Sequence, residues 1–444
     1  MNNLIILGGG ESGTGAAILG KQKGFKVCLS DIGKLDDKYK KVLSQNDIDF
    51  EEGQHTESRI LEADLVIKSP GIPEHISLIQ EILKNRIPMI SEIEFAARYT
   101  DAKLICITGS NGKTTTASMT YHILKSAGKN VGLAGNIGQS FAWAVATKNY
   151  DIYVLEISSF QLDGMFDFKA EIAILTNITP DHLDRYNNKL QNYVDSKMRI
   201  LQNMTSSNQL IYNADDPVVV AEIDKRKPEA DLYPFTIKKE VEKGACLVND
   251  EIRIKNQKEN YIMSIRNLAL QGKHNTYNSM AAGIAAKLMN IRNKNLKESL
   301  TEFQELPHRM EKVATIGGIQ YINDSKSTNV NSSYFALDSI NKPIVWIAGG
   351  KDKGNDYSSI EKMVANKVKA IICLGLNNTS IIENFGKLVP TVMESYSAEE
   401  AVEMAQRIAE AGDVVLMSPA CASFDLFENY EDRGNKFKNA VYEL

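Results

Sequence analysis

An apolar run that ends in a glycine-rich turn and a lysine constrains the fold of this chain more than any other feature. Residues 103–107 form the apolar run, and residues 109–116 read Gly-Ser-Asn-Gly-Lys-Thr-Thr-Thr, before a helical pattern that extends to Ala127. A strand, a glycine turn and a helix in this order are typical of one unit of a parallel α/β sheet. We therefore predict an α/β fold.

The turn at residues 109–116 also has the chemistry of a phosphate-binding loop. Backbone N–H groups at the start of a helix point toward bound anions, and glycines let the backbone approach them closely. Lys113 would neutralise the β- and γ-phosphates of a nucleotide, and the hydroxyl of Thr114 would reach Mg²⁺. Ile107 stands where the strict motif has its first glycine, so a purely structural loop is the alternative.

A second glycine-rich turn lies near the start of the chain, again after an apolar run. Gly8, Gly10 and Gly13 are spaced as in a dinucleotide fingerprint, and Asp31 ends the next predicted strand. Any nucleotide whose phosphates approach a helix N-terminus fits this pattern. A uridine nucleotide is the favoured ligand, with NAD and a turn of purely structural purpose as alternatives.

The length of the chain sets its domain organisation. A chain of 444 residues exceeds what a single core usually holds and predicts about two to four domains. Pro307 interrupts the helical pattern that precedes it. We predict three α/β domains: a Rossmann-like nucleotide domain over residues 1–91, a central P-loop ATPase-type domain with a parallel sheet over residues 92–305, and a Rossmann-like C-terminal domain over residues 306–444.

Composition and charge argue against several classes of protein. A net charge of −5 disfavours a general nucleic-acid or membrane-surface binder, since those partners favour clustered Lys and Arg. The 5 cysteines are widely spaced and form no Cys-x-x-Cys pair, so neither a disulfide framework nor a thiolate zinc site is indicated. The chain has no signal-peptide pattern at its start and no run of roughly 18 apolar residues. We therefore expect a cytoplasmic protein.

Two segments of the central domain place polar side chains after predicted strands. Glu156 follows an apolar run, where a carboxylate can hold the Mg²⁺ of a bound nucleotide. Residues 179–186 bring an imidazole, two carboxylates and a guanidinium into one short loop, in which His182 is a candidate metal ligand. An ordinary strand-end carboxylate and an exposed bystander histidine are the respective alternatives.

Two segments of the C-terminal domain have the same position relative to predicted strands. Residues 323–329, Asn-Asp-Ser-Lys-Ser-Thr-Asn, and residues 418–425, Ser-Pro-Ala-Cys-Ala-Ser-Phe-Asp, each follow an apolar run. The carboxyl ends of parallel strands meet at the ligand edge of a sheet. Both segments are thus candidates for a site, although turn chemistry alone would also explain their composition.

An ordered set of short segments gives the chain a family resemblance. The segments are Ser69-Pro70-Gly71-Ile72, Gly135-Asn136-Ile137-Gly138, residues 155–162, Leu306-Pro307-His308-Arg309, residues 323–329 and residues 418–434. No segment is sufficient alone, but the set resembles the Mur ligase superfamily, and within it the branch that adds D-glutamate. The resemblance extends over nearly the whole chain.

The resemblance implies an ATP-dependent amide ligase of peptidoglycan precursor synthesis. Its substrates would be UDP-N-acetylmuramoyl-L-alanine, D-glutamate and ATP, bound respectively to the N-terminal, C-terminal and central domains. The implied contacts of the uridine substrate are Ser12, Asp31, Ser69 and Asn136. The implied contacts of ATP are Gly109, Asn111, Gly112, Lys113, Thr114, Thr115, Asn275, Asn278, Arg309 and Asp324. The implied contacts of D-glutamate are Thr328, Lys353, Ser423 and Tyr430.

The metal ligands also come from the resemblance. Two Mg²⁺ ions are implied, with the matching ligands Thr114, Glu156, His182 and Lys197. The family carries the lysine at the Lys197 position as a carbamate, formed with CO₂. An ammonium about 4 Å from a divalent cation would be repelled by about 8 kcal/mol at an effective dielectric constant near 20, whereas a carbamate would bind the cation. An unmodified lysine on a helix surface is the alternative.

Three positions depart from the family pattern. Residues 8–13 read Gly-Gly-Gly-Glu-Ser-Gly, which varies from the usual turn. Tyr430 stands where Phe is frequent, and Lys351 adds a cation near Lys353. These departures affect the expected details of uridine and carboxylate recognition.

The implied reaction starts at the L-alanine carboxylate, which is a poor electrophile until ATP converts it to an acyl phosphate. The amine of D-glutamate then attacks the acyl carbon, and ADP and phosphate are the co-products. Closure of the C-terminal domain would align the reactants and exclude water. We expect a monomer, with the catalytic residues Lys113, Glu156, His182 and Lys197.

Three other functions remain open at this point. A ligase that adds glutamate to folate shares the central and C-terminal features but does not need the first domain. A nicotinamide-dependent oxidoreductase explains residues 8–13 and leaves residues 109–116 and Glu156 unused. A regulatory ATPase would bind ATP, and no amino acid would accelerate its hydrolysis.

Overall fold

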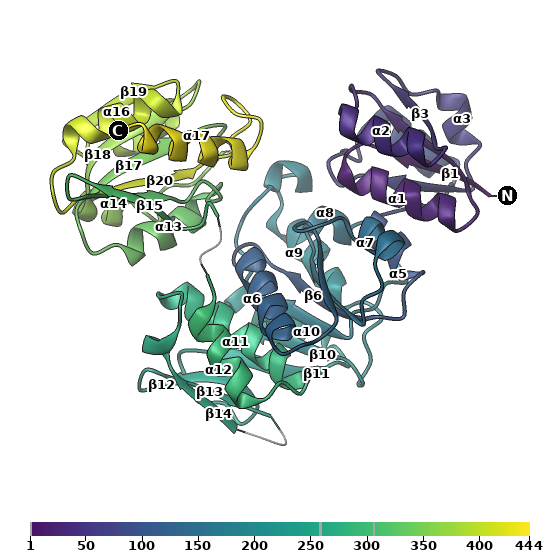
Figure 1. Ribbon diagram of the computed structural model, residues 1–444, viewed down its shortest axis with the longest axis horizontal. Helices are drawn as coiled ribbons and strands as arrows, with labels where there is room; N and C mark the ends of the chain where they lie inside the picture. Colours follow the sequence, from purple (N-terminus) through teal and green to yellow (C-terminus); the bar gives the residue numbers. More distant parts are fainter. Residues whose placement is uncertain (1, 257–259, 305–306, 353) are drawn as a thin grey trace. The chain divides into compact units, whose positions relative to one another are not determined.

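The chain forms three α/β domains, each built on its own sheet. The computed structural model describes residues 2–256, 260–304, 307–352 and 354–444. The chain divides into two compact units, Met1–Phe303 and Gln304–Leu444. The first unit contains two sheets and the second unit contains one (Figure 1). The predicted fold class is confirmed, while the predicted boundary at residues 305 and 306 lies outside the described residues.

The N-terminal sheet has five parallel strands in the order β3-β2-β1-β4-β5. Its order reverses direction between β1 and β4, which is the position where open α/β sheets bind ligands. The strands are β1 (Asn3–Leu7), β2 (Lys26–Asp31), β3 (Asp49–Glu52), β4 (Leu65–Lys68) and β5 (Met89–Ile90). The helices are α1 (Glu11–Gln22), α2 (Asp37–Gln45), α3 (Glu57–Leu61) and α4 (Ser77–Lys84), and α5 (Glu92–Ala97) leads into the next domain.

The central sheet has nine strands in the order β14-β13-β12-β11-β10-β9-β6-β8-β7. The strands β6 to β12 are paired in parallel, whereas β12, β13 and β14 form an antiparallel meander that the predicted parallel sheet did not include. The strands are β6 (Lys103–Thr108), β7 (Val131–Gly135), β8 (Ile152–Glu156), β9 (Ile172–Leu175), β10 (Gln209–Asn213), β11 (Asp231–Thr236), β12 (Gly244–Val248), β13 (Glu251–Lys255) and β14 (Asn260–Ser264).

Several helices of the central domain pack on this sheet. In Figure 1 α11 and α12 lie beside α6, and the three helices are in contact. The helices are α6 (Lys113–Ser126), α7 (Phe141–Thr147), α8 (Ser159–Leu162), α9 (Leu190–Met198), α10 (Pro217–Arg226), α11 (Lys273–Leu288) and α12 (Asn293–Glu302), with short 3₁₀ segments η1 (Leu183–Tyr186), η2 (Arg199–Leu201) and η3 (Ile265–Asn267).

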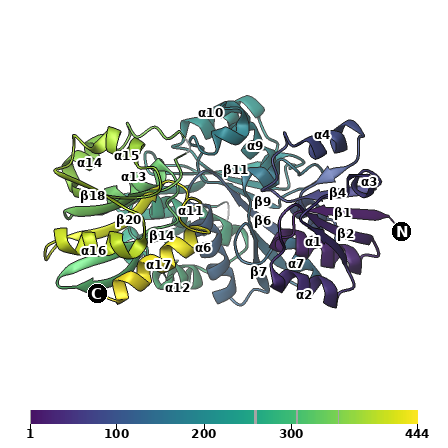
Figure 2. The same cartoon turned by 90° about the horizontal axis from the view of Figure 1, so that it is seen from above.

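The C-terminal sheet has six strands in the order β15-β16-β20-β17-β18-β19. All pairs are parallel except β15 with β16. Figure 2 shows α16 and α17 side by side on this domain, in agreement with their contacts. The strands are β15 (Glu311–Ile316), β16 (Ile319–Asn323), β17 (Ile344–Gly349), β18 (Val368–Leu374), β19 (Thr391–Ser395) and β20 (Val414–Ala420); the helices are α13 (Val330–Ser339), α14 (Glu361–Lys367), α15 (Thr379–Phe385), α16 (Ala398–Ile408) and α17 (Tyr430–Tyr442).

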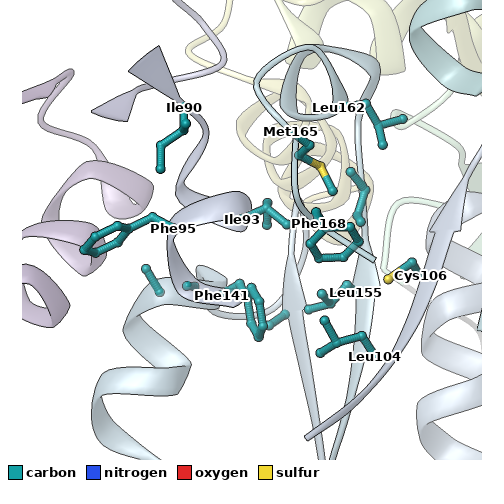
Figure 3. Close-up of a cluster of buried hydrophobic side chains, with 14 of the residues drawn as sticks. Ile90, Ile93, Phe95, Leu104, Cys106, Phe141, Leu155, Leu162, Met165 and Phe168 are labelled. Carbon is teal, nitrogen blue, oxygen red and sulfur yellow. The ribbon is translucent and has the colours of Figure 1, made fainter. Parts of the chain in front are cut away.

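One hydrophobic core serves both sheets of the first unit. Figure 3 shows part of it, where Phe95 of α5, Phe141 of α7 and Leu155 of β8 lie in one buried cluster. Full burial of side chains of this size contributes about 1.5–3 kcal/mol each. This shared core fixes the N-terminal and central domains as one compact unit.

Two sequence expectations concern cysteines and membrane spans. All 5 cysteines are buried and free in the structure. Among the described residues, no helix is both long and apolar enough to cross a membrane.

Candidate active site

The glycine turn at residues 109–112 joins β6 to α6, as predicted. Gly109 has φ +145, and a Cβ atom there would lie 1.9 Å from Thr176 Oγ1, so only glycine fits. Gly112, with φ +82, is the residue before α6. No side chain caps the N-terminus of α6. The backbone N–H groups of this helix start are therefore available to an anion.

The segment after β9 holds this turn in place. Asn111 N donates to Asn177 Oδ1 at 2.9 Å, and Thr176 Oγ1 donates to Asn111 O at 2.7 Å. Ser110 Oγ donates to Thr179 O at 2.8 Å. Strands β6 and β9 are neighbours in the sheet. The segments 109–116 and 179–186 are far apart in the sequence. In the structure they therefore lie together at the same edge of the central sheet.

Lys113 folds back over its own turn. Its Nζ donates to Gly109 O and to Ser110 O, both at 2.8 Å. Thr114 is half-buried in the first turn of α6, and Thr115 is buried. The ammonium therefore lies directly above the backbone that would surround a phosphate.

Two asparagines of α11 pack behind the same turn. Thr116 Oγ1 donates to Asn278 Oδ1 at 3.2 Å, and Asn278 Nδ2 donates to Asn275 Oδ1 at 3.3 Å. A Cβ atom on Gly112 would lie 2.6 Å from Asn278 Oδ1. The structure thus brings Asn275 and Asn278, two of the residues predicted to contact ATP, next to the glycine turn at residues 109–112.

Glu156, at the end of β8, is buried with a relative exposure of 1%. Its Oε1 accepts a hydrogen bond from Asn136 Nδ2 at 2.7 Å. Its Oε2 has no hydrogen-bond partner among the described residues. A buried carboxylate oxygen without a partner is costly, whereas a cation would satisfy it. The residue therefore fits a metal ligand, and Asn136, predicted to contact the uridine substrate, is bonded to it.

Lys197 of α9 is buried with a relative exposure of 1%, so it is not a surface lysine. Its Nζ lies 4.7 Å from the centre of the Tyr193 ring. Burial first, and then the charge of Lys113, lowers the pKa of Lys197 well below its usual value, against the opposing charges of Asp181, Asp163 and Glu156. A neutral amine is the form that can react with CO₂, so this environment fits a carbamate.

His182 lies at the start of η1 in a left-handed conformation, with φ 52. Its side chain is 37% exposed, and its Nε2 is 3.8 Å from Asp181 Oδ1. The ring contacts Phe160 edge to face at 5.2 Å. Within the described ranges, no three His, Cys, Asp or Glu side chains are grouped closely enough to hold a metal ion. A metal beside Glu156 and His182 would thus need a ligand of another kind.

The N-terminal turn has a carboxylate at its centre. Asp31 Oδ2 accepts from Gly9 N at 2.6 Å, and Asp31 Oδ1 accepts from Gly33 N at 2.7 Å. Ser69 Oγ is 3.5 Å from Gly8 O, and Ser12 is half-buried in the first turn of α1. Ser12, Asp31 and Ser69 therefore belong to one edge of the N-terminal sheet, while Asn136 belongs to the central sheet.

Asp324 of the C-terminal domain is buried beside two hydroxyls. Burial raises its pKa to about 6, against hydrogen bonds that its Oδ2 accepts from Ser327 Oγ at 2.5 Å and Ser418 Oγ at 2.8 Å. The nearby charge of Arg309 also favours the carboxylate. Arg309 Nε is itself buried without a hydrogen-bond partner in the described part of the chain. Arg309 Nε can thus donate a hydrogen bond to a further acceptor.

Three of the residues predicted for D-glutamate, Thr328, Ser423 and Tyr430, follow strands of the C-terminal sheet in two neighbouring segments. Ser325 Oγ donates to Tyr430 O at 2.8 Å, which joins the loop of Thr328 to the start of α17. Ser423 is buried, Thr328 is half-buried, and Lys326 Nζ lies 3.7 Å from the centre of the Tyr430 ring. Lys353 lies outside the described residues.

Arg433 of α17 joins these loops, and residue-by-residue sequence reasoning missed it. The side chain has 0% exposure, and it donates to Ser325 O at 2.9 Å, Ser325 Oγ at 3.0 Å and Cys421 O at 3.2 Å. Its position inside the segment 418–434 was the available signal. A buried guanidinium with several carbonyl acceptors fixes the geometry of the loops that contain Ser325 and Cys421.

Three family models match the chain in order. The MurD N-terminal domain model matches residues 4–78, the Mur ligase middle domain model residues 107–286, and the Mur ligase glutamate ligase domain model residues 308–421. The N-terminal turn, the phosphate turn and the loops joined by Arg433 each belong to one of these domains. The models thus support the resemblance found in the sequence.

Individual relatives agree with these models. The UDP-N-acetylmuramoylalanine–D-glutamate ligase of Bacteroides fragilis is 53% identical over 445 residues, which cover 100% of this chain and 100% of that protein. A pseudomurein peptide ligase type C from Methanothermus fervidus shares the fold with a TM-score of 0.64, at 21% identity and 100% coverage of both chains. The MurF ligase of Thermotoga maritima, in complex with ADP, has a TM-score of 0.58 at 15% identity and covers 86% of this chain and 90% of that one. This chain belongs to the Mur ligase family.

Proposed function

We propose that this protein is the ATP-dependent ligase that joins D-glutamate to UDP-N-acetylmuramoyl-L-alanine in peptidoglycan precursor synthesis. The observation that carries the proposal is the identity of 53% over the full length of a relative with that name. The arrangement of Lys113, Glu156 and Lys197 at one edge of the central sheet supports it, because that edge has the groups that phosphoryl transfer requires.

The first chemical step is transfer of the γ-phosphoryl group of ATP to the L-alanine carboxylate. The carboxylate oxygen forms a bond to phosphorus, the bond to the β-phosphate oxygen breaks, and ADP leaves. Lys113 and the N–H groups at the start of α6 would stabilise the charge on the phosphates. Asn275 and Asn278, packed behind Gly112, would lie on the adenine side, and Arg309 and Asp324 would reach the nucleotide from the C-terminal domain.

The residues at the edge of the central sheet fit divalent metal ions. Glu156 has a buried oxygen without a partner among the described residues, and Lys197 has a buried amine whose lowered pKa favours the neutral form that a carbamate requires. These two residues, with His182 and Thr114, would hold Mg²⁺. When bound, the metal would withdraw charge from the phosphoryl oxygens. Among the described residues, no three His, Cys, Asp or Glu side chains form a metal site by themselves. The carbamate would supply a further oxygen ligand.

The second step forms the amide bond. The amine of D-glutamate attacks the acyl carbon, the carbon–oxygen bond to phosphate breaks, and the amine loses a proton. Thr328, Lys353, Ser423 and Tyr430 would bind the amino acid, and Arg433 would hold their loops. Ser12, Asp31, Ser69 and Asn136 would hold the uridine substrate, and closure of the C-terminal domain would exclude water from the acyl phosphate.

The test is phosphate release with UDP-N-acetylmuramoyl-L-alanine, ATP and a panel of D- and L-amino acids. We expect release to require all three substrates and to be fastest with D-glutamate. Preference for any other amino acid would refute the proposed specificity. Release that no amino acid accelerates would favour a regulatory ATPase, and use of a folate in place of the uridine substrate would favour the folate-type ligase.

A nicotinamide-dependent oxidoreductase is the remaining alternative. It would use the N-terminal turn, where Asp31 already accepts hydrogen bonds from two backbone N–H groups. It would give no role to the buried Glu156 and Lys197. Absorbance of the reduced cofactor, followed with and without candidate substrates, distinguishes this activity.

We further propose that the protein acts as a cytoplasmic monomer without a nucleic-acid or membrane partner. The net charge of −5 supports this view. Light scattering on the purified full chain, with and without substrates, tests the oligomeric state. A stable dimer at micromolar concentration would contradict it.

A further inference from the structure

Arg185 lies in the same loop as His182 but has no part in the reaction described above. Its guanidinium faces a loop of the N-terminal domain more than a hundred positions earlier in the sequence. NH1 donates to Gly71 O at 3.3 Å, and NH2 donates to Pro70 O and Ile72 O, both at 3.4 Å. One side chain of the central domain thus meets three consecutive backbone carbonyls of the Ser-Pro-Gly-Ile segment.

The other side of Arg185 contacts the residues near the metal position. Its Cζ lies 4.6 Å from the centre of the Phe160 ring. The same ring contacts His182 edge to face at 5.2 Å and stacks on Tyr186 at 5.9 Å. Phe160 belongs to α8, which follows directly after β8 and Glu156. A movement of the Arg185 guanidinium would therefore shift the Phe160 ring, which contacts His182.

The Ser-Pro-Gly-Ile loop, to which Arg185 donates hydrogen bonds, also contacts the N-terminal glycine turn. Ser69 N donates to Leu7 O at 2.9 Å, and Ser69 Oγ is 3.5 Å from Gly8 O. Lys68 Nζ donates to Ile72 O at 3.0 Å, so a second cation holds the same loop. Burial is the main cause that lowers the pKa of Lys68. The positive charge of Arg185 lowers it further, and the negative charge of Glu74 acts in the opposite direction. Direct contacts thus run from the glycine turn to His182.

We propose that Arg185 is a positioning residue that couples the occupancy of the N-terminal nucleotide site to the arrangement of His182 at the ATP site. The inference rests on the proposed function, since it assigns the uridine substrate to the N-terminal turn. The planar guanidinium can donate to several carbonyls and stack on Phe160 at the same time. A lysine offers one point charge and no planar surface.

Arg199 is a matched control for this role. Its guanidinium also lies over a phenylalanine ring, 5.4 Å from the centre of Phe166, and also donates to backbone carbonyls, to Leu162 O at 2.8 Å and to Met165 O. All of these contacts are inside the central domain. Arg199→Ala removes the same kinds of contact without touching the Ser-Pro-Gly-Ile loop.

The experiment measures coupling between the two substrates by titration calorimetry on the full chain. UDP-N-acetylmuramoyl-L-alanine is titrated into the wild type, Arg185→Ala, Arg185→Lys and Arg199→Ala, each with and without ADP and Mg²⁺. We expect ADP to change the Kd of the uridine substrate about tenfold in the wild type and in Arg199→Ala. The ratio should fall to nearly one in Arg185→Ala and to an intermediate value in Arg185→Lys.

Each other outcome decides against the inference. An unchanged ratio in Arg185→Ala overturns it, and so does equal loss in Arg199→Ala, since that would be a general structural effect. A wild-type ratio of one also overturns it. If Arg185→Ala does not fold, the ratio in Arg185→Lys alone decides. Failure of the proposed function gives a different result, because the wild type would then not bind the uridine substrate at all.

Discussion

The two glycine-rich turns of the first compact unit share a backbone plan and differ in the charge that surrounds them. Each follows a parallel strand and opens a helix, α1 in one case and α6 in the other. In the N-terminal turn, a carboxylate, Asp31, accepts the N–H of Gly9 at 2.6 Å. In the central turn, the cation of Lys113 lies over Gly109 O and Ser110 O, and neutral Asn177 accepts the N–H of Asn111.

In both turns the backbone N–H groups at the helix start can bind an anion. The difference indicates that the nearby side chains determine which ligand binds there. A carboxylate inside the turn repels phosphate and favours hydroxyl or N–H donors of a ligand. An ammonium inside the turn favours phosphate. If the protein is the ligase proposed above, the same local pattern in its sequence would serve two of its substrates.

Lys113→Ala should have the largest effect, because it removes the positive charge of the central turn. We expect phosphate release to fall at least about a hundredfold, as when a single transition-state contact is lost. Lys125→Ala, at the exposed end of the same helix, is the control and should keep the wild-type rate. Wild-type turnover in Lys113→Ala would show that the central turn does not bind the transferred phosphate.

Lys197→Ala should reduce phosphate release by a similar but recoverable amount. The variant loses the carbamate oxygen that would face the metal, and a small carboxylic acid such as acetate should replace it in part. The measurement is the rate of phosphate release against acetate concentration, with chloride at equal ionic strength as the control. No loss of activity, or a loss that acetate does not reduce, would argue against the carbamate.

Asp31→Asn should affect only the N-terminal turn. The amide keeps one acceptor oxygen but replaces the other, so the hydrogen bond from Gly9 N or from Gly33 N is lost. We expect the KM for the uridine substrate to rise about tenfold, which corresponds to 1.4 kcal/mol, while the KM for ATP changes less than twofold. Equal changes in both constants would show that the two turns do not serve separate substrates.

Glu92→Gln should have the smallest effect, on stability at alkaline pH. Glu92 of α5 is buried; its Oε2 accepts a hydrogen bond from Ala142 N at 2.8 Å, and burial raises its pKa to about 7 from the usual 4.5. Because the pKa is raised in the folded state, its stabilisation is complete below pH 4.5 and is lost as the pH rises through 7.

The glutamine cannot ionise, so its Tm should exceed that of the wild type by about 2–4 °C at pH 8.5 and differ little at pH 5. Thermal unfolding at both pH values measures the difference. A wild-type Tm that does not fall relative to the variant between these pH values would contradict the raised pKa.

The parts of this molecule that sequence predicts well are those with local patterns. Strand, glycine turn and helix follow one another at residues 103–127, so β6, the phosphate turn and α6 are visible without the structure. Glu156 follows its own strand in the same way. The neighbours that give these residues their chemistry come from elsewhere, as with Asn136, bonded to Glu156 from the adjacent strand end.

Other features depend on pairings that no local pattern contains. The meander β12 to β14 lacks the strand–helix alternation that marks the rest of the sheet, so it was not predicted. The burial of Lys197 depends on α9 packing against α8 and η1, which the local sequence of α9 does not reveal. Arg185 and Arg433 act on carbonyl groups, which every residue has, so their partners leave no signature in the sequence.

The position of Lys113 has a consequence for nucleotide exchange. Its ammonium donates hydrogen bonds to Gly109 O and Ser110 O, both at 2.8 Å. If this turn binds ATP as proposed, the two carbonyl oxygens compete with the nucleotide phosphates for the ammonium of Lys113. The same oxygens would accept its hydrogen bonds again when ADP leaves, so this competition would lower the affinity for the nucleotide and speed the release of product.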